Sequence, residues 1–218
     1  MRRWMFVSLL AACGSPSPRE PPAPITLAAA HGAAEHIDGE LDDPAWREAE
    51  VSSRFVDARS GEAVTPYTEA RALCDRDALT LSIYAADEDL VSSDRVGAIL
   101  HVPGGGTFVL DVDPSATVRW HVPSASAGTV PDGVTVEVDA DATLDVDDLE
   151  DEEWVTEMRI PWRALGVDGP VDVRANFFRR DQPRESLVRS LAWTPWRDQP
   201  TASLETLGVI HCAPRETT

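Results

Sequence analysis

Apolar and polar residues alternate one by one along several short segments of this chain. The pattern is clearest at 79–84, 134–139, 154–160 and 171–178, where every second residue is apolar. Successive side chains of a β-strand point to opposite faces of the sheet, so this alternation is typical of strands with one buried face. The chain is therefore expected to fold mainly from β-strands.

Turn-forming residues separate these segments at short intervals. Glycine, proline and aspartate gather at 75–77, 104–106, 131–133 and 168–170, where they favour turns. Further strands are expected at 96–102, 107–112, 117–122, 187–193 and 206–212. Proline at the first position predicts short helical turns at 44–50 and 161–165. Many short strands with little helix predict an all-β fold, a two-sheet antiparallel β-sandwich of the immunoglobulin or jelly-roll type.

The first 13 residues have the composition of a bacterial lipoprotein signal peptide. Arg2 and Arg3 precede an apolar run, and Leu10-Ala11-Ala12-Cys13 fits the lipobox, whose cysteine receives a diacylglycerol before cleavage. The run is much shorter than the about 20 residues that span a bilayer. We therefore expect an exported protein, anchored by lipid on Cys13 to the cell envelope, at the outer membrane or periplasmic face. The alternative is a cysteine that follows an ordinary signal by chance.

The rest of the chain divides by composition. Residues 14–34 are rich in proline and alanine, which predicts an extended tether between lipid and domain. The alternating pattern then indicates a single β-sandwich domain at 35–212, followed by a short tail at 213–218. We expect the protein to be a monomer.

The chain is strongly acidic, with a formal net charge of −19. Such a surface repels phosphate backbones, which argues against nucleic acid as a partner. Ten carboxylates crowd into residues 137–153, and crowded oxygens suit Ca²⁺. Their spacing is not that of an EF-hand loop, so we expect a solvated acidic face, no catalytic residue, no metal site and no cofactor. Structural calcium in this stretch is the alternative.

Two cysteines remain if Cys13 carries the lipid. Cys74 and Cys212 both end strand-like segments, and an exported protein folds where disulfides persist. The sequence leaves two possibilities open, a Cys74–Cys212 disulfide or two buried free thiols.

Five segments in order resemble the carbohydrate-binding module family 9-like domains. They are Ile37-Asp38-Gly39-Glu40-Leu41-Asp42-Asp43-Pro44-Ala45-Trp46, then Thr68-Glu69-Ala70-Arg71-Ala72-Leu73 leading to Asp89-Leu90, Glu153-Trp154-Val155-Thr156-Glu157-Met158-Arg159-Ile160-Pro161-Trp162, Arg174-Ala175-Asn176-Phe177-Phe178-Arg179, and Leu207-Gly208-Val209-Ile210. They span nearly the whole domain. The resemblance implies a β-sandwich that binds a polysaccharide or a glycan end without catalysis, as an accessory to carbohydrate catabolism.

One stretch departs from that family. Residues 96–110 are shorter and plainer than the aromatic and acidic segment that the family carries there. This favours an alternative, a structural or interaction lipoprotein that keeps the sandwich and lacks a sugar site.

Tryptophans are the candidate sugar contacts, because an aromatic ring packs against the C–H face of a pyranose. Trp46, Trp154 and Trp162 occupy apolar positions of the matched motifs, so we expect them in the core. The remaining domain tryptophans and two polar neighbours form the predicted carbohydrate-binding site: Trp193, Trp196, Trp120, Asn176 and Arg179.

Overall fold

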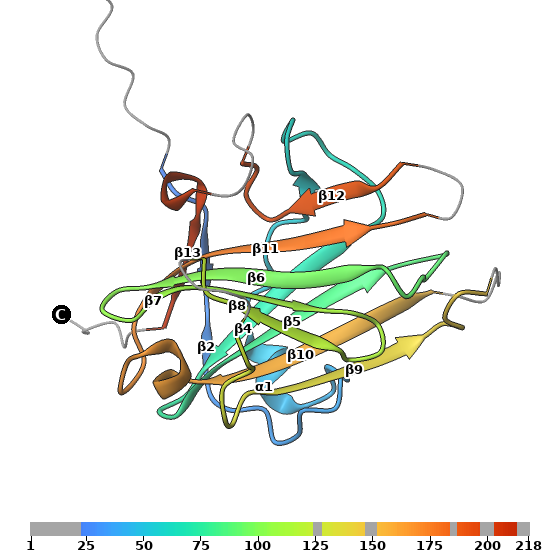
Figure 1. Cartoon of the computed structure of the whole chain (residues 1–218). Coiled ribbons are helices and arrows are strands. Elements are labelled where there is room, and N and C mark those ends of the chain that lie inside the picture. The colour runs from blue at the N-terminus through green and yellow to red at the C-terminus, as the bar shows by residue number, and fades with distance from the viewer. Residues whose placement is uncertain (1–22, 124–127, 147–151, 184–186, 197–202, 213–218) are drawn as a thin grey trace, which may run out of the picture.

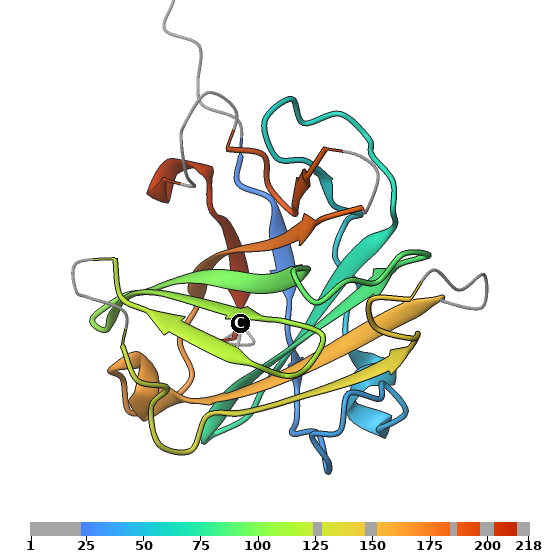
Figure 2. The same ribbon diagram turned by 45° about the vertical axis from the view of Figure 1, so that its right-hand side comes forward.

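Two β-sheets pack against each other in the computed structural model, which describes residues 23–123, 128–146, 152–183, 187–196 and 203–212. Figures 1 and 2 show the strands as two stacked layers, with very little helix between or around them. The predicted two-sheet, all-β sandwich is confirmed.

The larger layer, sheet A, contains eight strands. Its main order is β1-β13-β11-β6-β7-β8, and β12 and β3 extend it beside β11. The strands are β1 (Thr26–Ala28), β3 (Val56–Asp57), β6 (Arg95–Val102), β7 (Gly106–Val112), β8 (Val118–His121), β11 (Val173–Asp181), β12 (Arg189–Ala192) and β13 (Gly208–His211).

The smaller layer, sheet B, contains five strands in the order β2-β4-β5-β10-β9. They are β2 (Ala30–His31), β4 (Thr68–Cys74), β5 (Ala78–Ala86), β9 (Thr135–Asp141) and β10 (Glu153–Pro161). The helix α1 (Pro44–Glu48) and the 3₁₀ turns η1 (Trp162–Leu165) and η2 (Leu204–Thr206) complete the described elements. The first two begin at or next to a proline, as the sequence predicts.

The strands differ from the prediction chiefly at the N-terminal edge. β1 pairs in parallel with β13, and β2 pairs in parallel with β4, so two edge pairs of an otherwise antiparallel fold are parallel. Leu27 on β1 is fully buried. The predicted tether boundary at residue 34 is therefore wrong, because residues 26–28 form a strand of sheet A and residues 30–31 form a strand of sheet B. Two- and three-residue strands carry too little alternation to be recognised in a segment rich in proline and alanine.

The core lies between the two sheets and follows the alternation seen in the sequence. Trp154, Met158 and Ile160 point inward from β10, and Ala175 and Phe177 point inward from β11. Every second residue along these strands is thus removed from water, which accounts for most of the stabilisation by apolar burial.

A second, smaller apolar cluster covers the outer face of sheet B. Trp46 of α1 packs there with Ala49 and Leu73, so this predicted core tryptophan is buried outside the sandwich interior. The indole N–H of Trp46 donates to Glu157, whose carboxylate also accepts the backbone N–H groups of Asp38 and Gly39 at 2.9 and 3.1 Å. These bonds satisfy a fully buried carboxylate and fix the N-terminal segment on the sheet.

A disulfide joins the two sheets. Cys74 ends β4 and Cys212 follows β13, and their Cα atoms lie 5.5 Å apart, within the range that a disulfide requires. The bridge lies where the chain crosses from β1 in sheet A to β2 in sheet B, since Cys74 is in register with His31 and His211 with Ala28. Of the two possibilities left open by the sequence, the structure has the bonded pair.

Several predicted features lie outside the described residues, namely the signal with Cys13, the first part of the tether (14–22), and the tail. Among the described residues, no helix is long and apolar enough to span a bilayer.

Candidate functional site

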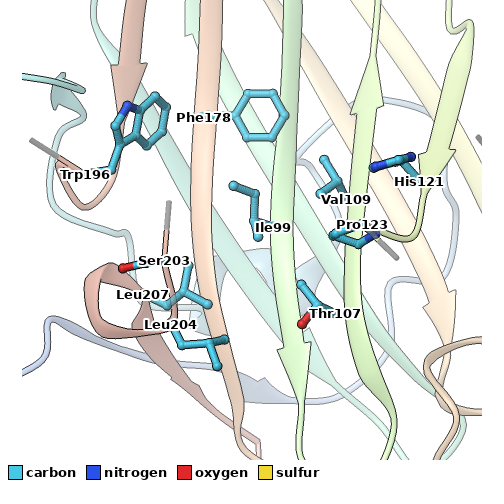
Figure 3. A pocket seen from close by; sticks show the side chains of 10 residues that line it. All are labelled: Ile99, Thr107, Val109, His121, Pro123, Phe178, Trp196, Ser203, Leu204 and Leu207. Carbon is cyan, nitrogen blue, oxygen red and sulfur yellow. The ribbon is translucent and has the colours of Figure 1, made fainter. Parts of the chain in front are cut away.

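An apolar groove of about 570 Å³ runs over the outer face of sheet A (Figure 3). Strands β6, β7, β8 and β11 form its floor, and the segments around Trp196 and η2 form one side. Its lining residues are Ile99, Thr107, Val109, His121, Pro123, Phe178, Trp196, Ser203, Leu204 and Leu207. We refer to this set as the apolar groove.

The groove exists because the middle of β6 is apolar on both faces. Ala98 and Leu100 point into the core, and Ile99 points out. Val109 lies opposite Ile99 on β7 and extends the outward apolar surface. A strand with a solvated outer face would carry polar residues at these positions. The unbroken apolar run at 96–100 is the sequence signal for this surface, which tryptophan positions alone do not indicate.

Phe178 lies over β6 because Gly97 leaves room for its ring. The two residues are in register on β11 and β6, and a Cβ atom added to Gly97 would approach Phe178 Cζ to 2.6 Å. The same atom would lie 2.2 Å from the carbonyl oxygen of Leu110, which is fixed in the sheet. Glycine at position 97 therefore sets the depth of the groove beneath the ring.

Trp196 is held beside the groove by backbone bonds and by a buried amide. Asn176 donates from its side-chain nitrogen to the Thr194 carbonyl at 2.7 Å and accepts the Thr194 N–H at 2.9 Å. The backbone N–H of Trp196 donates to the Ala58 carbonyl at 2.9 Å. Trp196 is half-buried and lines the groove, so its role as a sugar contact stays a prediction. Asn176 is fully buried and positions this segment, so its expected role as a direct ligand contact is corrected.

Trp193 and Trp120 point into the core. Trp193 is 1% exposed and packs on Phe177 at a ring distance of 5.6 Å, whereas Trp120 is 4% exposed and packs on Phe108 at 5.4 Å. Neither ring can stack on a sugar in this arrangement, so both are corrected from candidate contacts to core residues. The alternation places Trp193 inward together with Leu191, and its position at the end of β12 made it resemble a loop residue.

Arg179 is also buried, and its bonds are internal. Its guanidinium lies 2.7 Å from Asp87 and 2.8 Å from Asp181, and it donates to the Ala86 carbonyl at 2.6 Å. Asp94 joins Asp87 and Asp181, with ligand oxygens within 4.8 Å of one another. The arginine thus links sheet A to sheet B through a charged cluster, and the expectation that it contacts sugar is corrected.

The groove has few polar side chains, with Thr107 on β7, His121 on β8 and Ser203 on the opposite side (Figure 3). His121 and Thr107 line it, and the Thr107 hydroxyl is 2.9 Å from Nδ1 of His101. Imidazole and hydroxyl groups can donate to or accept from the hydroxyls of a ligand that rests on the apolar floor. The groove can therefore hold a ligand by apolar contact and orient it by hydrogen bonds.

The described part of the acidic stretch begins on β9 and ends at Glu153, the first residue of β10. Glu137, Asp139 and Asp141 are exposed on one face of the strand. Within the described part of this stretch, no three carboxylates come close enough to share an ion. Residues 147–151 lie outside the described residues, so the possibility of calcium at 137–153 stays a prediction.

No protein-family model matches the sequence, and no curated protein matches it. Solved structures do match the fold. A Bacteroides uniformis protein to which carbohydrate binding is attributed superposes with a TM-score of 0.63 at 14% identity, over 87% of this chain and 99% of that one.

Two structures of a family 9 carbohydrate-binding module from Caldicellulosiruptor kristjanssonii also match, each at 16% identity. The complex with cellotriose gives a TM-score of 0.63, over 85% of this chain and 92% of that one. The complex with glucose gives 0.61, over 88% and 98%. The resemblance drawn from the five sequence segments is confirmed at the level of the fold: this chain has a carbohydrate-binding module family 9-like fold.

Proposed function

We propose that this protein is a non-catalytic carbohydrate-binding lipoprotein that holds a glycan chain or glycan end in the apolar groove. The observation that carries the proposal is a half-buried aromatic pair, Trp196 and Phe178, on an apolar floor, in a fold shared with modules solved with cellotriose and glucose. The C–H face of a pyranose packs against such rings, and His121 and Thr107 supply hydrogen bonds at the margin.

The acidic surface selects among glycans. With a net charge of −19, the protein repels sulfated and uronate-rich chains, so neutral oligosaccharides are the expected ligands of this groove. One shallow site with two aromatic contacts supports a dissociation constant of about micromolar to millimolar.

The location belongs to the same proposal. The lipobox at Cys13 supports anchoring by lipid at the cell envelope, with the sandwich presented outside the cytoplasm. Replacement of Cys13 by Ser is expected to abolish incorporation of labelled palmitate and to release the protein from membranes or leave the precursor uncleaved. Equal labelling of the variant would contradict the anchor.

Titration calorimetry with neutral oligosaccharides tests the binding site. The variant Trp196→Ala is expected to weaken binding at least about tenfold, since loss of a stacked ring removes both apolar contact and orientation. Val51→Ala is a matched control, because Val51 is an exposed apolar residue that does not line the groove. Binding that is unchanged in Trp196→Ala would place the sugar elsewhere.

The apolar character of the groove also supports a second function, binding to another protein. Leu204 is 46% exposed at its rim, and Ile99, Val109 and Leu207 offer no hydrogen bonds from their side chains. Such a surface also suits an apolar segment of another protein, the role of an interaction lipoprotein. If no neutral glycan binds and Leu204→Asp abolishes association with an envelope protein, this second function replaces the first.

A further inference from the structure

A second pocket, of about 1180 Å³, lies on the other sheet and shares no lining residue with the apolar groove. It opens on the outer face of sheet B where β4 begins, β5 ends and β10 begins, beside the loop at 64–66. Two tyrosines, five carboxylates and two arginines contribute to its lining. We name it the tyrosine pocket, after Tyr67 and Tyr84.

The two tyrosine rings are fixed in place and present aromatic surface. Their centroids lie 6.1 Å apart with the planes at 65°, and Tyr67 is 38% exposed. The Tyr67 hydroxyl donates to Glu69 and the Tyr84 hydroxyl donates to Glu153. Burial, aided by the hydrogen bond to Glu153, raises the pKa of Tyr84 to about 12, so the phenol stays neutral. The pocket therefore has a preset aromatic wall.

The two arginines are engaged with the protein. Arg54 lies over the Tyr67 ring, 5.3 Å from its centroid, and donates to the Val64 carbonyl at 2.8 Å. Arg189 pairs with Asp181 and donates to the Thr65 carbonyl at 3.3 Å. Both guanidiniums hold the loop at 64–66 against the sheet, and neither forms an ion pair with Glu88 or Glu152.

Two carboxylates of the lining, Glu88 and Glu152, have no cation partner among the described residues. Glu88 and Glu152 are exposed lining residues, and no hydrogen bond or ion pair joins either side chain to another described residue. Glu153 is oriented by Tyr84 and retains oxygen lone pairs for a further donor. An aromatic wall beside Glu88 and Glu152, which no described cation pairs with, has the chemistry that attracts a ligand carrying positive charge.

We propose that the tyrosine pocket binds a glycan segment that carries protonated amino groups, such as unacetylated 2-amino-2-deoxyhexose units. A sugar ring packs against Tyr67, its ammonium group donates to Glu88, Glu152 or Glu153, and its hydroxyls bond the remaining polar groups of the lining. That the ligand is a glycan rests on the proposed function. The position of the pocket and its preference for a cation rest on the residues described above.

The test compares three trisaccharides of one shape by calorimetry at low salt and about pH 6, where a primary amine is protonated. They are the β-1,4-linked glucosamine trimer, its N-acetylated counterpart and cellotriose. The glucosamine trimer is expected to bind the tyrosine pocket, and the double variant Glu88→Gln, Glu152→Gln is expected to weaken that binding about tenfold. Tyr67→Ala is expected to weaken it similarly, and Tyr67→Phe is expected to retain it because the ring remains.

Controls separate this site from the apolar groove. Glu137→Gln removes an exposed carboxylate that does not line the tyrosine pocket and is expected to leave binding unchanged. Trp196→Ala is expected to weaken binding of cellotriose at the apolar groove and to leave binding of the glucosamine trimer at the tyrosine pocket unchanged. The proposal for the groove and the proposal for the tyrosine pocket can therefore fail independently. Equal binding of the acetylated and amino trimers here, or no effect of the Glu88 and Glu152 substitutions, would overturn the inference. Equally tight binding of spermidine would also overturn it, since the pocket would then recognise simple cations.

Discussion

At the residue scale, one of the predicted carbohydrate-binding side chains lies at the surface of the groove and the others are buried in the fold. Trp196 lies at the groove, whereas Trp193, Trp120, Asn176 and Arg179 are buried. The alternation in the sequence predicts which face of a strand a side chain points to. It does not predict which side chains are covered by loops in the folded protein. An outward position such as Asn176 can therefore be buried beneath the segment that it holds.

Arg179 is expected to be the most sensitive charged residue of the fold. Its replacement by Ala leaves Asp87 and Asp181 buried without their shared cation, which should lower the free energy of unfolding by about 3 to 5 kcal/mol. Urea denaturation measures the effect. Arg180→Ala, an exposed neighbour on the same strand, should change stability by less than about 0.5 kcal/mol. Equal effects of the two variants would contradict the role assigned to Arg179.

Asp94 should make stability depend on pH. Burial raises its pKa to about 7, although the backbone N–H groups of Val91 and Gln182 donate to the carboxylate and oppose the shift. The pKa in the unfolded chain is about 3.9, so the folded state binds the extra proton between these values. The proton on Asp94 therefore contributes its full stabilisation of the fold below about pH 4, and this stabilisation is lost as the pH rises through about 7.

Thermal unfolding between about pH 4 and pH 8 measures this contribution. The midpoint of Asp94→Asn should fall less steeply with rising pH than that of the wild type, because the variant cannot ionise at this position. The same slope in both proteins would show that Asp94 does not hold a proton in the fold.

At the scale of elements, alternation located most strands and failed at the edges. β5, β9, β10 and β11 lie close to the predicted segments because each carries several apolar residues on one face, which are buried in β5, β10 and β11 and half-buried in β9. β1 and β2 have only two or three residues each and pair in parallel with strands remote in sequence. Such pairing is decided by tertiary contacts, which no local pattern encodes.

Truncation at the two possible domain boundaries distinguishes them. A chain that starts at residue 24 should unfold like the full mature protein, because it keeps β1 and β2. A chain that starts at residue 35 loses the fully buried Leu27 and both edge pairings, which should cost at least about 2 to 5 kcal/mol. Chemical denaturation of both proteins measures the difference in the free energy of unfolding. Equal denaturation midpoints would show that the folded domain begins after residue 34.

At the scale of the whole molecule, two sheets are joined by a shared core, by the Arg179 cluster and by the Cys74–Cys212 disulfide. Hydrophobic periodicity was sufficient to predict the sandwich. The apolar groove and the tyrosine pocket depend on which loops and strands meet, so the sequence located only Trp196 among their lining residues.

The disulfide closes a sequence separation of 138 residues. In the chain-entropy model, such a cross-link stabilises the fold by about 4 to 5 kcal/mol, and native strain reduces this value. The double variant Cys74→Ser, Cys212→Ser should therefore unfold at clearly lower denaturant concentration than the oxidised protein. Titration of thiols under denaturing conditions provides the control, with neither cysteine reactive before reduction. Reactive thiols at both Cys74 and Cys212 in the unreduced protein would contradict the bridge.

Binding of a neutral glycan at the outer face of sheet A should shift the backbone amide NMR signals of the groove during titration with cellotriose. We expect saturable shifts at Ile99, Val109, Phe178 and Trp196, which line the groove, and none at residues of the outer face of sheet B such as Tyr84. The same titration of Trp196→Ala should give weak or absent shifts at these groove residues. Shifts confined to sheet B, or no shifts with any neutral oligosaccharide, would contradict the account.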